Sequence, residues 1–140
     1  MNKSIITTVA IAILATANAS AQKMEESKVP ANIVKAFKAK YPKTEKVKWE
    51  LEKANYEAEF ELNEVETSVT LDAKGNIIET ESEIPVAQLP KAVAEYMSKN
   101  APKEKIKEAA IIIDAKGTKM YEAEVDKKDY LFDENGTFIK

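Results

Sequence analysis

Two hydrophobic periods alternate along the chain, and the alternation occurs twice. Residues 30–42 and 90–102 carry apolar side chains three or four positions apart, begin with a proline and end with another. This pattern predicts a short amphipathic helix in each segment. After each helix the hydrophobic period falls to two, as in residues 46–63, which predicts strands with one buried face.

The two halves also repeat one another in order. Tyr56–Phe60 (YEAEF) matches Tyr121–Val125 (YEAEV), and residues 69–78 match residues 130–139. Two copies are too few for a solenoid, whose units generally number at least about three. We therefore predict an α+β protein in which two tandem repeats, each a helix followed by a four-stranded meander, form one domain.

The strands are expected in a fixed order within each repeat. Their predicted ranges are 46–52, 56–63, 65–71 and 77–84 in the first repeat, and 105–113, 119–126, 129–132 and 137–140 in the second. A two-residue loop at Ala54–Asn55 would place Trp49 opposite Phe60, Leu51 opposite Ala58 and Val47 opposite Leu62. In the second repeat, Ile111 would face Tyr121 and Ala109 would face Ala123.

Three short motifs, each opening with aspartate and closing with glycine, predict tight corners between strands. They are Asp72–Gly75 (DAKG), Asp114–Gly117 (DAKG) and Asp133–Gly136 (DENG), and they hold all the glycine in the chain. A three-residue hairpin loop favours aspartate at its start and a left-handed glycine at its end. A calcium loop needs several alternating acids, whereas the DAKG loops offer one aspartate each, so we interpret these motifs as turns.

The N-terminus has the pattern of a secretory leader. A short basic start is followed by an apolar run, Ile5–Ala17, and by the small residues Ala19-Ser20-Ala21. We predict a signal peptide over residues 1–21, cleaved after Ala21, and a periplasmic or secreted protein without membrane insertion after cleavage. A flexible segment, 22–28, would precede the domain at 29–140, with repeats at about 29–84 and 85–140.

Composition removes several classes of function. The chain has neither cysteine nor histidine, which excludes disulfides, cysteine or histidine catalysis and the common zinc sites. Its formal net charge of −3 argues against nucleic acid or an anionic membrane as a partner. No phosphate-binding or dinucleotide motif occurs, and no carboxylate sits in a context that suggests a raised pKa. We therefore expect no enzyme activity, no cofactor and no metal site.

Several of these motifs together resemble a known family. The leader, the two proline-started helices, Val47–Glu50 (VKWE), Tyr56–Phe60 (YEAEF) and the D-x-K-G-x-I corner are similar to those of the PepSY-like, β-lactamase-inhibitor-like proteins secreted by Bacteroidetes-type bacteria. The resemblance covers the predicted mature chain. It implies one curved antiparallel sheet with both helices on one face and the other face open. In the inhibitor that gives the group its name, that open face grips an enzyme.

Most candidate partner-binding residues are those that the strand pattern turns toward the open face, and Tyr130 is added as the more exposed aromatic, close to the end of a strand. In the first repeat these residues are charged, and Glu79, Glu81 and Glu83 would extend the charged surface. This surface could bind a partner protein or a divalent cation, or it could simply be solvated. In the second repeat, apolar residues on outward positions predict an interface. The full candidate set is Lys48, Glu50, Glu57, Glu59, Glu61, Ala110, Ile112, Met120, Tyr130, Leu131 and Ile139.

These observations favour a non-enzymatic binding module that recognises, and in one version inhibits, an exported protein through its open sheet face. One alternative is a binder of divalent cations or small ligands that uses the acidic strands. Another is a self-associating envelope protein. We expect a monomer or a weak homodimer.

Overall fold

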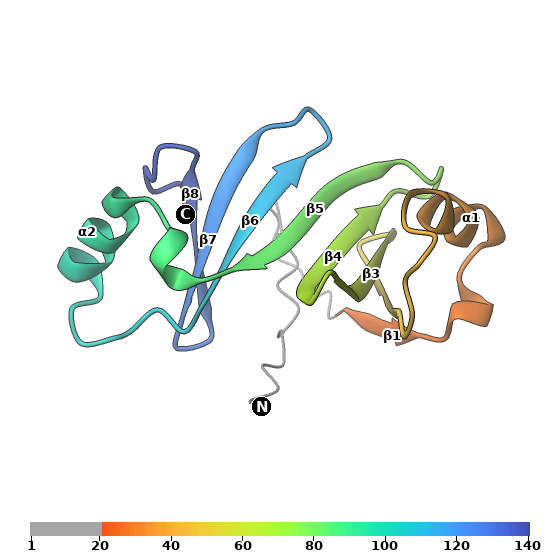
Figure 1. The fold of residues 1–140 in the computed structure, drawn as a ribbon, viewed down its shortest axis with the longest axis horizontal. Coiled ribbons are helices and arrows are strands. Elements are labelled where there is room, and N and C mark those ends of the chain that lie inside the picture. The colour runs from red at the N-terminus through yellow and green to blue at the C-terminus, as the bar shows by residue number, and fades with distance from the viewer. Residues whose placement is uncertain (1–20) are drawn as a thin grey trace.

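The two repeats form one continuous sheet backed by two helices in the computed structural model, which describes residues 21–140 (Figure 1). The eight antiparallel strands lie side by side in chain order. Their bounds are β1 Gln22–Met24, β2 Lys48–Glu52, β3 Asn55–Leu62, β4 Val65–Leu71, β5 Ile77–Ile84, β6 Glu108–Asp114, β7 Lys119–Val125 and β8 Lys128–Asp133. The predicted α+β architecture is confirmed.

Each helix covers one half of the sheet. Helix α1, Ala31–Lys40, is capped by Pro30, and helix α2, Lys91–Asn100, is capped by Pro90. Proline suits this position because its fixed φ leads into the first helical turn. Among the described residues, neither helix is long and apolar enough to cross a membrane.

The hydrophobic core is divided between the repeats. In the first repeat, the ring of Phe37 on α1 lies 5.3 Å from that of Trp49 and 5.1 Å from that of Phe60, both edge to face. In the second, Tyr96 on α2 packs edge to face on Phe132 at 5.5 Å. These rings belong to two separate clusters of buried residues. The repeats are therefore joined chiefly through the pairing of β5 with β6.

The predicted pairing of the first hairpin is wrong by two residues. Trp49 lies opposite Ala58, and Leu51 opposite Tyr56, because the turn is formed by Lys53 and Ala54 rather than by Ala54–Asn55. Both turn residues have positive φ, 48° and 68°, without any glycine to signal them. A shift of two residues preserves the face of every side chain. The second-repeat pairs, Ile111 with Tyr121 and Ala109 with Ala123, are confirmed.

Both ends of the sheet differ from the prediction. Segment 22–28 contains β1, which pairs with β2, and a 3-10 turn at Glu26–Lys28. At the other end, 137–140 forms no strand and is held by a single bridge between Phe132 and Phe138 and by hydrogen bonds to Leu131. The ring of Phe138 also stacks on that of Tyr96, with centroids 4.5 Å apart, so the segment packs against α2 instead of extending the sheet. The predicted signal peptide, apart from Ala21, lies outside the described residues.

The three aspartate–glycine motifs form the predicted turns. In the first, the backbone amides of Lys74 and Asn76 both donate to Oδ1 of Asp72 at 2.9 Å. Gly75 closes the loop at a φ of +90°. The same two amide contacts recur at Asp114 and Asp133. Each aspartate carboxylate accepts backbone hydrogen bonds within its own turn, and these bonds fix the conformation of the turn.

Candidate binding face

The side of the sheet opposite the helices, called here the open face, follows from the strand register. One row crosses it from β2 to β7 through directly paired residues: Lys48, Glu59, Ser68, Glu81, Ile112 and Met120. Alternate residues of each strand share this face. The neighbouring rows add further acids, among them Glu57, Glu79, Glu83, Glu122 and Glu124. The open face is therefore strongly acidic.

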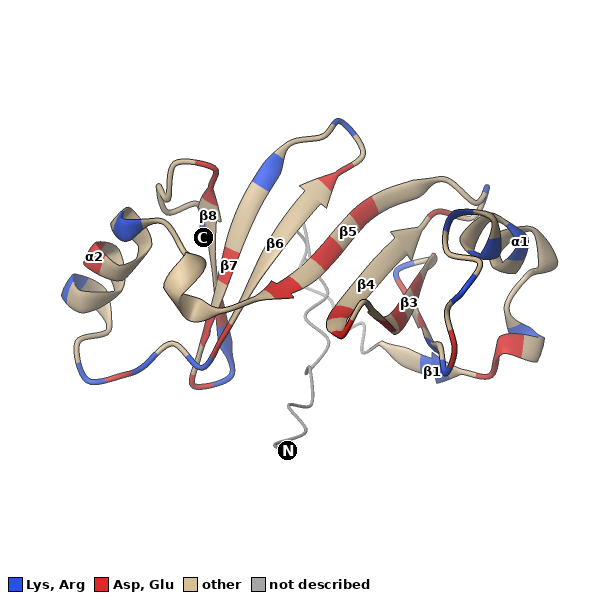
Figure 2. Ribbon diagram, in the orientation of Figure 1, with Lys and Arg blue, Asp and Glu red and all other residues tan. Residues whose placement is uncertain are grey.

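Charge is segregated between the two sides of the protein. Figure 2 shows acidic residues along the strands, most densely on β5, while basic residues gather on α1 and α2. The helices carry Lys35, Lys38, Lys40, Lys91 and Lys99. This arrangement directs the negative potential of the protein to the open face.

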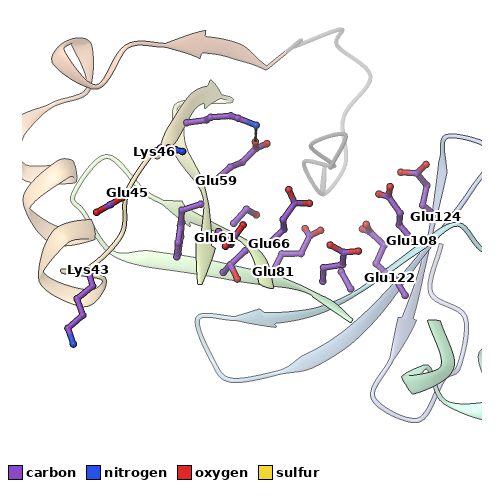
Figure 3. Close-up of a pocket in the computed structure, with 17 residues that line it drawn as sticks. Lys43, Glu45, Lys46, Glu59, Glu61, Glu66, Glu81, Glu108, Glu122 and Glu124 are labelled. Atoms are coloured by element: carbon purple, nitrogen blue, oxygen red, sulfur yellow. Dashed lines mark ion pairs between the residues drawn. The ribbon is translucent and has the colours of Figure 1, made fainter. Parts of the chain in front are cut away.

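A cleft of about 450 Å³ runs across the open face and takes its walls from both repeats (Figure 3). Lysines line it at the β2 end, and glutamates from β3 to β7 line the remainder. The cleft residues of the glutamate portion are Glu59, Glu61, Glu66, Glu81, Glu83, Glu108, Glu122 and Glu124, over a floor that includes Ala109 and Ala110. Its size is that of a typical ligand pocket.

Burial and mutual repulsion raise the pKa values of several of these carboxyls. Desolvation raises the pKa of Glu57 to about 7, although a hydrogen bond with Ser68 opposes the rise. Desolvation, followed by repulsion from Glu122, holds the pKa of Glu81 well above its usual range. The pKa of Glu122 is raised by its own burial and by Asp129, against a weaker attraction from Lys140. The expectation that no carboxyl has a raised pKa is therefore wrong.

Raised carboxyl pKa values occur over most of the open face. Desolvation is the largest cause of a raised pKa at five further carboxyls, namely Glu50, Glu66, Glu79, Glu108 and Asp129. Sequence alone missed this because the effect comes from strands that lie far apart in the chain and side by side in the sheet.

Two carboxylates in the cleft lack a protein partner. Among the described residues, Glu122 makes no hydrogen bond or ion pair, although only 5% of its surface is exposed. Atom Oε2 of Glu66 is also buried without a hydrogen-bond partner in this part of the chain. Buried polar groups are normally paired, so Oε2 of Glu66, and Glu122 with only a weak attraction from Lys140, are incompletely compensated by residues 21–140.

The acidic face does not converge to a metal centre. Across residues 21–140, no group of three or more acidic side chains lies close enough together to hold a metal ion. Lys48 Nζ and Glu59 Oε2 lie 3.9 Å apart, the cross-strand ion pair that the corrected register creates.

Most of the predicted binding residues lie on the open face. The register places Lys48, Glu50, Glu57, Glu59 and Glu61 there in the first repeat. In the second repeat it places there Ala110, Ile112, Met120 and Leu131. The hypothesis that both repeats contribute to one surface therefore has a physical basis in the sheet.

The apolar part of that set is not an exposed patch. Ala110 is 7% exposed and Ile112 fully buried, and each lies between long side chains of the neighbouring strands. Leu131 is buried too, beside the C-terminal residues that hydrogen-bond to it. Only Ile139, outside any strand, is half exposed.

Tyr130 lies on the other side of the sheet. It pairs with Ala123, packs against the second core cluster and has its ring 6.3 Å from that of Phe138. Strand alternation therefore turns Tyr130, which is partly buried, toward α2 and away from the open face, and its contact with a partner stays a prediction.

Five cleft acids were absent from the predicted set: Glu45, Glu66, Glu108, Glu122 and Glu124. The internal repeat could have indicated two of them. Glu122 and Glu124 occupy the positions in YEAEV that Glu57 and Glu59 occupy in YEAEF. For Glu66 and Glu108 the available signal is strand alternation, which puts both on outward positions of the predicted strands 65–71 and 105–113.

A protein-family model matches the chain twice, over residues 16–79 and 64–140. The model describes the family as “Putative beta-lactamase-inhibitor-like, PepSY-like”. The chain belongs to this PepSY-like family. The two matches agree with the two helix-plus-meander units seen in the fold. No curated protein matches the chain in a direct comparison.

Solved structures share the PepSY-like fold. A DUF2874 family protein from Bacteroides uniformis is 21% identical with a TM-score of 0.70, over 80% of this chain and 87% of that one. A “putative periplasmic” protein from Bacteroides eggerthii is 18% identical with a TM-score of 0.70, over 79% and 86%. A BLIP-like protein from Bacteroides fragilis is 25% identical with a TM-score of 0.62, over 79% and 83%.

Proposed function

We propose that this PepSY-like protein is a non-enzymatic binding module of the periplasm or the exterior, which recognises a partner protein through its open face. The acidic cleft carries this proposal, because its walls come from both repeats and its carboxylates include groups without a partner of their own among the described residues. The partner presents a basic surface, since like charges would repel it.

The fold supports rigid recognition. The cleft residues stand on regular strands, and those strands are held by tight corners and backed by two helices (Figure 1). Side chains that are already ordered lose little freedom on binding, which favours affinity. Long-range attraction by the acidic face would also accelerate encounter with a basic partner.

Inhibition of an exported enzyme is one version of this function. The family description names a β-lactamase inhibitor, and the B. fragilis relative is called BLIP-like. The descriptions of the family and of the three similar structures name no enzyme activity for those proteins.

The leader pattern at Ile5–Ala21 and the description of the B. eggerthii protein both support an exported location.

Capture from a periplasmic extract tests the proposal when variants are compared side by side. The protein is immobilised, and bound proteins are eluted with increasing salt and identified. A double charge reversal, Glu59→Lys with Glu61→Lys, and Ile112→Asp should each lose partners that the unmodified protein retains. The matched control, Glu104→Lys with Glu134→Lys, reverses two exposed charges outside the cleft and should retain them.

Retention of every partner by both open-face variants would show that the open face is not the contact. Circular dichroism checks that Ile112→Asp still folds, because Ile112 is fully buried.

Two further measurements test the alternative functions. A calorimetric signal with calcium that disappears in Glu57→Gln and Glu59→Gln would favour a cation binder, and sedimentation that changes with concentration would favour self-association.

A further inference from the structure

Ala110 marks a recess in the part of the cleft formed by β5, β6 and β7. It has only a methyl group, while Glu83 and Glu122 lie directly across from it on β5 and β7. Glu108 precedes it by two positions on the same strand. Glu81 and Glu124 occupy diagonal positions on the neighbouring strands. A single small side chain is thus surrounded by carboxylates on one face of the sheet.

The spacing in the sheet sets the size of this recess. Directly paired side chains have Cβ atoms about 5 Å apart, and diagonal ones about 7–8 Å. Carboxylates around a methyl group at these spacings leave a shallow depression with an apolar floor and acidic walls. Ile112, two residues further along β6, is fully buried and supports this floor from the same strand.

In the described part of the chain, the only attractive charge among the causes of the Glu122 pKa is the weak one of Lys140, which is outweighed by burial and by neighbouring acids. Glu122 is almost fully buried and makes no hydrogen bond or ion pair with any described residue. In Figure 3 its carboxylate points into the same space as those of Glu108 and Glu124. A buried carboxylate without a partner is unfavourable, and a cation brought by a ligand would relieve this cost.

We propose that the recess above Ala110 receives the ammonium or guanidinium group of a lysine or arginine side chain from the partner protein. The aliphatic stem of that side chain would lie on Ala110, and its charged head would reach Glu83 and Glu122. A cation on a stem fits better than a bare metal ion, since no three acids of residues 21–140 converge on one point. The inference rests on the proposed function and specifies which chemical group enters the cleft.

Isothermal titration calorimetry with a capped tetralysine peptide, Ac-KKKK-NH2, tests the recess. The Ala110→Leu variant fills it without changing any charge, and Glu122→Gln removes the buried carboxylate while preserving its shape. Each should weaken peptide binding about tenfold or more. The matched control, Glu134→Gln, removes one acid in the β8 turn outside the cleft and should bind within about twofold of the unmodified protein.

Unchanged binding by Ala110→Leu or Glu122→Gln would overturn the proposal. The isosteric Glu122→Gln variant decides the matter if Ala110→Leu does not fold. Spermine and calcium serve as comparison ligands. Tighter binding of spermine than of the equally charged peptide, or tighter binding of calcium that Glu122→Gln abolishes, would assign the recess to a small cation and contradict the proposal.

The outcome separates this inference from the proposed function. If the Glu59/Glu61 charge reversal loses captured partners while Ala110→Leu binds tetralysine normally, the open face remains the contact and only the recess is rejected. If no open-face variant affects either measurement, both ideas are rejected.

Discussion

Glu50 and Glu57 lie directly opposite one another on β2 and β3, with exposed fractions of only 9% and 6%. Two like charges in a directly opposed pair repel, and burial strengthens that repulsion. The pair belongs to a surface on which many carboxyls have raised pKa values. Such a surface is unfavourable for folding at neutral pH, which suggests that it is maintained for binding.

Stability should decrease as the pH rises through neutrality. The pKa of Glu57 rises from 4.5 in the unfolded chain to about 7 in the folded protein. The folded state therefore retains a proton that the unfolded state releases, so this contribution is full below about pH 4.5 and is lost as the pH rises through about 7. The free energy of unfolding should be about 2 kcal/mol higher at pH 5 than at pH 8.

Urea unfolding followed by Trp49 fluorescence measures this difference. Glu57→Gln should reduce it, while Glu134→Gln should leave it unchanged. Hydrogen bonds in their turns lower the pKa values of Asp72, Asp114 and Asp133. The free energy of unfolding should therefore fall again at acid pH, as these three carboxylates become protonated. A protein that becomes steadily more stable from pH 5 to pH 8 would contradict the account of the open face.

The two core clusters should unfold together. Phe37 belongs to the first cluster and Phe132 to the second, and both are fully buried. Replacing either by alanine should cost about 3–5 kcal/mol. Because β5 and β6 pair over residues 79–84 and 109–114, each variant should shift a single transition seen alike by Trp49 fluorescence and far-UV circular dichroism. Separate transitions for the two signals would show that the repeats are independent bodies.

Two glycines provide a matched test of the corners. Gly117 and Gly136 have nearly the same φ, +83° and +82°, but an added Cβ would meet nothing within 4 Å at Gly117. At Gly136 it would lie 3.0 Å from Cβ atoms of both Pro90 and Ala92. Gly117→Ala should cost about 1 kcal/mol, and Gly136→Ala about 1–3 kcal/mol more. Equal costs in urea unfolding would mean that the last turn does not pack against α2 as described.

The first hairpin turn can be improved. Lys53 and Ala54 both have positive φ, a conformation that asparagine and glycine adopt more readily. The double change Lys53→Asn and Ala54→Gly should stabilise the protein by about 0.5–1 kcal/mol. A lower thermal midpoint would contradict the positive φ observed at these two positions.

The fold could be predicted from sequence because its signals are local. Proline-started helices, period-two strands and aspartate–glycine corners each depend on neighbouring residues, and the family resemblance joined them into one sheet. The register of the first hairpin could not be predicted, because Lys53–Ala54 carries no turn signal. The cleft was only partly foreseen. Strand alternation marks Glu66 and Glu108 as outward and Tyr130 as inward, but which outward acids share one cleft depends on strands that meet only in the assembled sheet.

The central claim is that the open face, and in particular its acidic cleft, is the recognition surface. Titration of the isotope-labelled protein with tetralysine, followed through its backbone amide and alanine methyl signals in NMR, tests this claim directly. The account predicts the largest shifts at outward residues of β4 to β7, centred on Ala110 and Glu122, with α1 and α2 nearly unaffected. Shifts centred on the helices, or no saturable shifts at all, would contradict it.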